Sequence, residues 1–160
     1  MSSLTRRLRS GAQIALVALA GLAGCAEKAP PPPVEIPLRN PTAPVGSQAD
    51  AGLARLQGGW IVVEGAGMTP GAKIEIGSSE MRVDGVALPL REEMPGRLRV
   101  GAETVWVHWI DADNRTAAMG EPGGGRVWIM DRRGAPGERR TAAREILAWY
   151  GYDLGRMQRP

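Results

Sequence analysis

The segment Met81-Arg82-Val83-Asp84-Gly85-Val86-Ala87-Leu88 contains the clearest turn signal of the chain. Asp84-Gly85 stands between two short stretches rich in apolar residues. A two-residue Asp-Gly loop is typical of a β-hairpin, because the tight turn needs a positive φ that glycine adopts without a steric penalty. The segment therefore predicts two antiparallel strands that are joined directly.

Further short strands surround this hairpin, and turn residues (Gly, Pro, Asp, Asn and Ser) separate them. We expect eight strands: Trp60–Glu64, Ala72–Ile76, Glu80–Val83, Val86–Leu90, Arg97–Val100, Thr104–Ile110, Arg115–Gly120 and Arg126–Asp131. Short connections between successive strands indicate an up-and-down antiparallel meander. A twisted sheet of this length tends to close, since closure removes its exposed edges. The predicted fold is mainly β, a small eight-stranded antiparallel barrel.

Helical periodicity appears on both sides of the predicted strands. Near the end of the chain, the apolar stripe of an amphipathic helix recurs at Ala143, Ile146, Leu147 and Tyr150, and Gly151 is placed as its C-terminal cap. We expect this α-helix to pack on the outer wall of the barrel. Before the strands, a short helical turn runs through Leu53 and Leu56, with Asp50 as its expected N-cap.

The N-terminal residues have the composition of an export signal. Three arginines before residue 10 precede an apolar run over residues 14–22, which is too short to span a bilayer as a helix. The run ends at Leu22-Ala23-Gly24-Cys25, which resembles the lipobox of bacterial lipoproteins at all four positions. The resemblance implies that Cys25 is lipidated, that cleavage falls between Gly24 and Cys25, and that residues 1–24 are a signal peptide. The alternative is an ordinary small cysteine within a cleaved signal.

Proline dominates the stretch that follows. Pro30–Pro33 is an uninterrupted run, and three more prolines precede residue 45. Such a segment favours an extended polyproline II conformation. We expect residues 25–50 to be a lipid-anchored linker that holds a domain over residues 51–160 away from a membrane. A proline-rich ligand for an adaptor module is the alternative.

The predicted anchor also suggests a location. Ala26 follows Cys25, and the absence of aspartate at that position resembles outer-membrane sorting in enteric bacteria. We expect the envelope of a Gram-negative bacterium, and the outer membrane facing the periplasm rather than the inner membrane.

Charge and composition exclude several classes of function. The chain has 20 basic and 17 acidic residues, but three of the basic ones lie before Cys25 and no acidic one does, so the mature chain has 17 of each. A neutral chain argues against nucleic-acid binding. With its one cysteine lipidated and with one histidine, His108, the chain is expected to hold no disulfide, metal or other cofactor.

Four stretches resemble conserved pieces of bacterial lipocalins, in the same order and at similar spacing. They are Gly58-Gly59-Trp60, residues 106–117, residues 120–132 and Gly151-Tyr152-Asp153-Leu154. The second resembles an apolar strand that runs into an Asp-x-Asp-Tyr-Arg turn, but Asn114 stands in place of the tyrosine. Only about fifty residues separate Trp60 from Trp109, fewer than is typical, so we expect short strands and a shallow interior.

The resemblance assigns roles to individual residues. Trp60, with Gly58 beside it, would close the barrel floor, and the guanidinium of Arg132 would lie over the Trp60 ring. A ligand site, if present, would lie inside the barrel and use some of Trp106, His108, Trp109 and Trp128. Strict alternation puts Trp109 with Val107 on one face and Trp106 with His108 on the other. Both faces are apolar, so the sequence leaves open which one points inward, and core packing is the alternative role for every one of these residues.

No catalytic constellation is recognisable. The chain has no Gly-x-Ser-x-Gly motif, and no acidic residue within two positions could orient His108. We expect the protein not to be an enzyme.

Two functions follow from these expectations. One is a membrane-anchored lipocalin-like barrel that binds a small hydrophobic ligand, by resemblance a fatty acid or lysophospholipid. The other is a non-catalytic structural or interaction lipoprotein whose barrel is filled by its own side chains, with protein partners that the sequence does not identify. The shortened middle favours the second function, and the resemblance favours the first.

Overall fold

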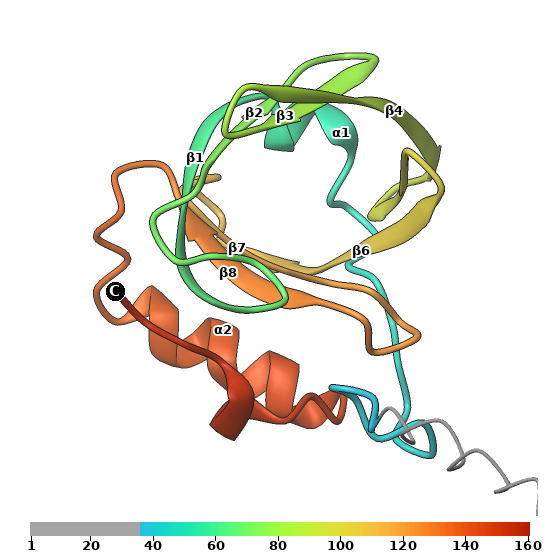
Figure 1. The fold of residues 1–160 in the computed structure, drawn as a ribbon, viewed down its shortest axis with the longest axis vertical. Coiled ribbons are helices and arrows are strands. Elements are labelled where there is room, and N and C mark those ends of the chain that lie inside the picture. The colour runs from blue at the N-terminus through green and yellow to red at the C-terminus, as the bar shows by residue number, and fades with distance from the viewer. Residues whose placement is uncertain (1–35) are drawn as a thin grey trace, which may run out of the picture. The chain divides into compact units, whose positions relative to one another are not determined.

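The computed structural model describes residues 36–160, which form a closed barrel of eight antiparallel strands with a helix packed outside it (Figure 1). The strands are β1 Gly58–Ala66, β2 Lys73–Ile76, β3 Glu80–Val83, β4 Val86–Met94, β5 Arg97–Val100, β6 Glu103–Ile110, β7 Thr116–Gly120 and β8 Val127–Asp131. Each strand pairs with the next, and β8 pairs with β1. The predicted fold class is confirmed. The predicted signal peptide, Cys25 and the first part of the predicted linker lie outside the described residues.

The Asp84-Gly85 hairpin is present as predicted. Val83 pairs with Val86, and both turn residues have positive φ, 48° at Asp84 and 85° at Gly85. The predicted strand bounds agree with the structure to within two residues, except that β4 continues four residues further, to Met94.

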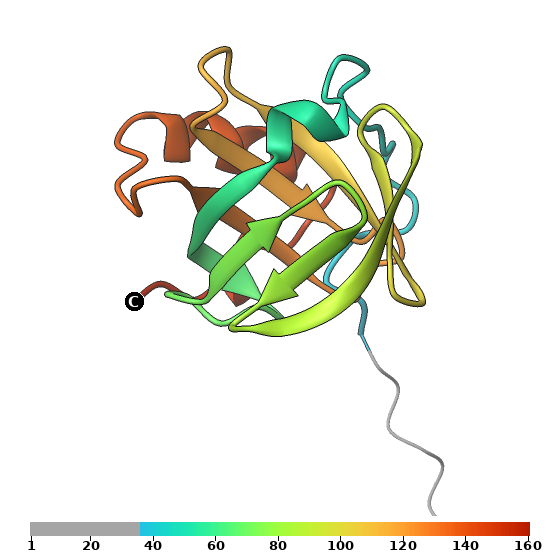
Figure 2. The ribbon, with the colours of Figure 1, turned by 90° about the horizontal axis from the view of Figure 1, so that it is seen from above.

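Three long strands, β1, β4 and β6, each pair with one neighbour through their first half and with the other neighbour through their second half. β1 pairs with β2 through Gly58–Ile61 and with β8 through Ile61–Ala66. β4 pairs with β3 through its first half and with β5 through its second half. β6 pairs in this way with β5 and then with β7. Because the long strands pair with both neighbours in succession, strands of only four or five residues between them complete the barrel (Figure 2).

Buried apolar side chains form two separate clusters. One fills the barrel and includes Trp60, Leu98, Met119 and Trp128. The other lies between the outer wall and α2, Arg139–Trp149, which packs against β6, β7 and β8. The wall between the clusters is therefore apolar on both faces.

Helix α2 has the predicted position. Ala143 and Leu147 are buried against the wall, and Gly151, with φ 82°, follows the end of the helix as expected for a C-terminal cap. None of the helices within residues 36–160 has the length and apolarity needed to span a membrane.

The predicted N-cap at Asp50 is wrong. The short helix α1 spans Leu53–Leu56, is preceded by Gly52 and has no side-chain cap from its own segment. Instead, Oε1 of Glu92, from β4, accepts the backbone N–H of Leu53 at 2.9 Å. Asp50 bonds to the side chains of Gln48 and Arg55. A partner distant in sequence therefore satisfies the start of this helix.

The domain extends further toward the N-terminus than the predicted boundary at residue 51. Leu38 belongs to the outer cluster, and the buried guanidinium of Arg39 donates to the carbonyl oxygens of Tyr150 at 2.8 Å and Pro122 at 3.3 Å. Arg39 also forms a β-bridge with Tyr152. Residues 36–50, which we call the N-terminal strap, thus run along the barrel and are not a free part of the linker.

Candidate functional site

One end of the barrel is closed by Trp60 and Arg132. The Arg132 guanidinium carbon lies 3.9 Å from the centroid of the Trp60 ring, and the indole N–H donates to the carbonyl oxygen of Leu56 at 2.6 Å. Gly58 lies beside them with φ 101°, and a Cβ there would come within 3.1 Å of the Arg132 guanidinium. The structure thus brings together the three residues expected at the barrel floor.

Arg132 also joins three segments at this end. Its guanidinium donates to the carbonyl oxygens of Asn114 at 2.6 Å, of Gln57 at 3.0 Å and of Arg55 at 3.0 Å. A planar guanidinium can stack on a ring and still donate in several directions, which the single ammonium of lysine cannot do. This end is therefore fastened by contacts of Arg132 with the Trp60 ring and with three backbone carbonyl oxygens.

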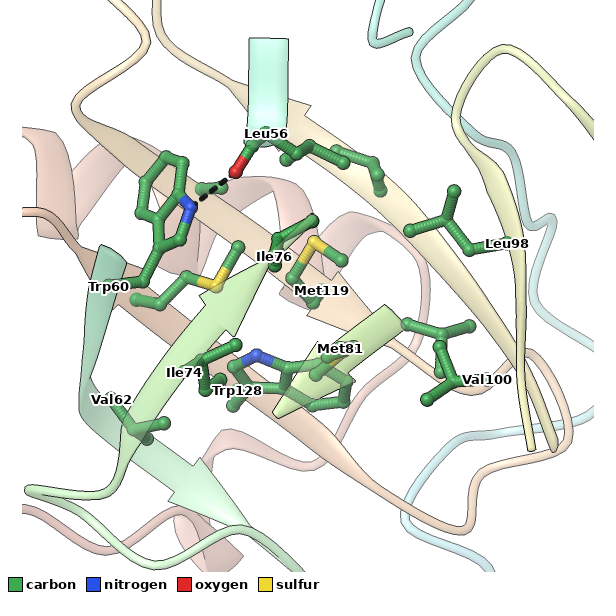
Figure 3. Close-up of a cluster of buried hydrophobic side chains, with 14 of the residues drawn as sticks. Leu56, Trp60, Val62, Ile74, Ile76, Met81, Leu98, Val100, Met119 and Trp128 are labelled. Carbon is green, nitrogen blue, oxygen red and sulfur yellow. Dashed lines mark hydrogen bonds between the residues drawn. The ribbon is translucent and has the colours of Figure 1, made fainter. Parts of the chain in front are cut away.

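The barrel interior is packed with its own side chains. Those of Leu56, Ile74, Leu98, Met119 and Trp128 converge from different strands and from α1 (Figure 3). Their exposed fractions are 1% or less. A depression of about 520 Å³ that is open to solvent lies between the strap, the β1–β2 loop and the C-terminal segment, residues 151–160.

Trp128 is the one member of the predicted ligand set that points into the barrel. Its indole N–H is buried, and no acceptor for it lies within the part of the chain that the structure describes. A buried donor without an acceptor is unfavourable by about 1–3 kcal/mol. Among the buried side chains of the described barrel interior, this N–H is therefore the polar group that an internal ligand or water could satisfy.

The other three members of that set lie on the outer face. Trp109 packs with the outer cluster, and the guanidinium carbon of Arg97 lies 4.2 Å from the centroid of the Trp106 ring. The expected alternation fails because β6 has a bulge between Val107 and Trp109. As a result His108 and Trp109 both face outward, and the four residues do not form one interior site.

His108 holds the N-terminal strap to the wall. Its Nδ1 lies 2.8 Å from the carbonyl oxygen of Gly46, and its Nε2 lies 2.9 Å from the hydroxyl of Tyr152. The Gly46 oxygen can only accept, so the neutral ring carries its proton on Nδ1 and is an acceptor at Nε2. The Tyr152 hydroxyl lies 2.9 Å from this Nε2 and 2.8 Å from the carbonyl oxygen of Glu121, so its one proton is shared between two acceptors. No carboxylate contacts either nitrogen among the described residues, and this arrangement is structural rather than that of a general base.

Burial controls the ionisation of this pair. It lowers the pKa of His108 to about 4, the Gly46 hydrogen bond opposes this shift, and the charge of Arg39 adds to it. Burial likewise raises the pKa of Tyr152. Gly120 allows the close contact, because a Cβ at that position would lie 2.5 Å from the Tyr152 hydroxyl oxygen. Both groups are therefore neutral at neutral pH.

A further buried ion pair was not predicted from the sequence. Glu64, in β1, is fully buried on the outer face, where its carboxylate pairs with Arg144 of α2 and lies 3.4 Å from Nε of Arg159. An acidic residue inside the otherwise apolar stretch Ile61–Ala66 was the available signal, together with the spacing of Arg140 and Arg144 along one face of the helix.

Comparison with known proteins gives no further guide to the site. No protein-family model matches the chain, and no curated protein sequence matches it significantly.

We predict that Arg132→Lys lowers the free energy of unfolding by about 2 kcal/mol, because lysine keeps the charge but loses the stacked, three-way hydrogen bonding. Chemical denaturation followed by tryptophan fluorescence measures this. Arg133→Lys is the matched control, since Arg133 is exposed and its side chain makes no hydrogen bond or ion pair with the described residues. Equal effects of the two substitutions would contradict the assigned role.

We predict that His108 makes stability fall with acidification between pH 6.5 and about 4. The unfolded histidine binds a proton below its ordinary pKa of 6.5, whereas the folded one does so only near 4, so the unfolded state binds more protons in this window. The full loss from this residue is about 3 kcal/mol.

Urea unfolding at several pH values within this window, on the wild type and on His108→Gln, isolates this contribution. The carboxylates titrate in both proteins, and the glutamine amide can still donate to Gly46. The wild type should lose stability more steeply than the variant. The same pH dependence of stability in the wild type and in His108→Gln would show that His108 does not cause the loss of stability.

Proposed function

We propose that this protein is a lipid-anchored lipoprotein of a Gram-negative envelope, and that its small barrel is a non-catalytic interaction module whose interior is filled by its own side chains. The observation that carries the proposal is the packing of large side chains inside the barrel, with Trp60, Met119 and Trp128 all nearly or fully buried. The resemblance of Leu22–Cys25 to a lipobox supports the anchor, and Ala26 in place of an aspartate after Cys25 supports a location at the outer membrane, facing the periplasm.

Energetics favour a module that acts through its surface. Burying an alkyl chain yields about 0.8 kcal/mol per methylene, but only where space exists to receive it. Vacating a packed methionine or leucine site costs about 2–5 kcal/mol, as core truncations show. Several such displacements would offset most of the gain from a fatty-acid chain.

A small hydrophobic ligand inside the barrel is the second candidate, and the unpaired indole N–H of Trp128 favours it. A fatty acid or lysophospholipid would bring an oxygen that accepts this hydrogen bond. In this case the interior side chains must rearrange on binding.

Titration with a fluorescent fatty acid, followed by tryptophan quenching, separates the two candidates. We predict no saturable signal for the wild type, and none for Trp128→Phe, which keeps an aromatic ring but removes the N–H. Saturable binding that Trp128→Phe weakens several-fold would instead establish the second candidate, because a buried hydrogen bond of this kind is worth about 1 kcal/mol.

The anchor is tested separately. We predict that Cys25→Ala abolishes labelling by a palmitate analogue and moves the protein from the membrane to the soluble fraction. The thiol is the expected attachment point, so Ser47→Ala is a matched control that should label as the wild type does. Labelling that persists in Cys25→Ala would refute the lipobox interpretation.

A further inference from the structure

A groove of about 300 Å³ runs along the exposed side of α2, between this helix and the C-terminal segment. We call it the α2 groove. Three arginines line it, Arg140 and Arg144 from the helix and Arg159 from the C-terminal segment. Ala148 and Leu154 supply an apolar part of the lining. A cationic groove with an apolar side suits a ligand that has both an anionic and a hydrophobic part.

The buried carboxylate of Glu64 positions Arg144. It pairs with Arg144, and no solvent reaches it. Its other oxygen lies 3.4 Å from Nε of Arg159 and accepts no hydrogen bond from the described residues, so it attracts Arg159 without fixing it. One carboxylate cannot satisfy the five N–H donors that each guanidinium carries, so both arginines keep donors for another anion.

Arg140 adds a positive charge that is not paired with another side chain among the described residues. Its guanidinium makes no ion pair or side-chain hydrogen bond with any residue between 36 and 160. Glu145, which also lines the groove, opposes the binding of an anion. Three guanidiniums against the carboxylates of Glu64 and Glu145 leave one net positive charge at the groove.

The wider charge distribution has the same polarity. Residues 132–160, which include α2, have seven arginines and three acidic residues, a net charge of +4. Residues 36–131 have nine basic and twelve acidic residues, a net charge of −3. Residues 80–94, which form β3 and β4, have two arginines and four acidic residues and lie across the barrel from α2 (Figure 1).

An exposed tryptophan on the same helix adds an amphipathic contact. Trp149 is 73% exposed, although most bulky side chains of the domain are buried. Indole rings favour the interface between water and lipid. Trp149 lies one residue beyond Ala148 and four beyond Glu145, next to the groove.

We propose that the α2 groove binds the headgroup phosphate of an anionic membrane phospholipid. Guanidiniums bind phosphate through paired, charge-assisted hydrogen bonds, and a basic surface is attracted to anionic lipid. Ala148, Leu154 and Trp149 favour a lipid over free phosphate. The contact is made by residues 140–159, with Glu64 as a positioning residue, and is independent of the lipid expected on Cys25. It can therefore fail or hold separately from the function proposed above.

The test uses the chain from residue 25 with Cys25→Ser, which carries no lipid but keeps the whole described domain. Sedimentation with vesicles of phosphatidylcholine, with and without about one third phosphatidylglycerol, measures binding. We expect binding only to the anionic vesicles, and release at high salt. Equal binding to both vesicles, or to neither, overturns the proposal.

Matched double variants separate the groove from overall charge. Arg140→Gln with Arg159→Gln should weaken binding at least about tenfold. Arg82→Gln with Arg91→Gln removes the same charge from β3 and β4 and should change binding less than about twofold. Equal losses in the two would show diffuse attraction and overturn the site. Arg140→Gln alone, which breaks no described contact, should weaken binding about threefold and guards against misfolding of the double variant.

Two further measurements test whether the ligand is an anion and whether its phosphate belongs to a lipid or is free. Glu145→Gln removes the opposing charge and should tighten binding about threefold, and no gain would count against a groove-bound anion. Inorganic phosphate is then compared with sulfate at equal ionic strength as a competitor. Both should act only by screening, and specific displacement by phosphate would identify a free-phosphate site and overturn the lipid headgroup as the ligand.

Discussion

The bulge in β1 is the constraint on which the rest of the structure depends. Between Val62 and Glu64 the pairing of β1 with β8 shifts by one residue. Val62 faces the interior, whereas Val63 and Glu64 both face the outer wall. Strict alternation would put Glu64 inside the barrel, where a carboxylate without a partner is strongly unfavourable. The bulge thus lets β1 close the barrel and still present a charged residue to α2.

A second bulge, in β6, redirects side chains in the same way at the opposite edge of the wall that β6, β7, β8 and β1 form. His108 and Trp109 face outward together, and Ile110 returns to the interior. β1 and β6 flank β7 and β8, and α2 covers this wall. Each bulge therefore gives an outward-facing side chain to a bound segment: Glu64 to α2, and His108 to the N-terminal strap. Bulges are frequent where a strand must redirect a side chain.

The features of this fold that depend on neighbouring residues were predictable from the sequence, and those that depend on distant residues were not. Turn residues such as Asp84-Gly85 are local signals, so the strands and the barrel were predictable from them. The bulge in β6 was not predictable. Trp106–Ile110 is apolar on both faces, so a shift in which residues face inward leaves no mark in the pattern of polar and apolar residues. The N-cap at Asp50 failed because Glu92, distant in sequence, supplies the acceptor. The strap was assigned to the linker from its prolines, although the buried contacts of Leu38 and Arg39 depend on residues more than eighty positions away.

The division of the core into two clusters has a consequence for function. A barrel that holds cargo needs interior space, and here Trp60, Trp128 and the methionines occupy it. The outer face, by contrast, has buried charged and polar groups, Glu64 and His108 in the wall and Arg39 in the strap, and each of them binds a peripheral segment. Burying such groups is unfavourable unless they are paired. Each of them therefore requires a partner in a defined position, and these partners lie on the outer face of the barrel. Because the strap, α2 and the C-terminal segment are all fastened to that one wall, their positions relative to one another are fixed by buried contacts, which is what the interaction module proposed above requires of its surface.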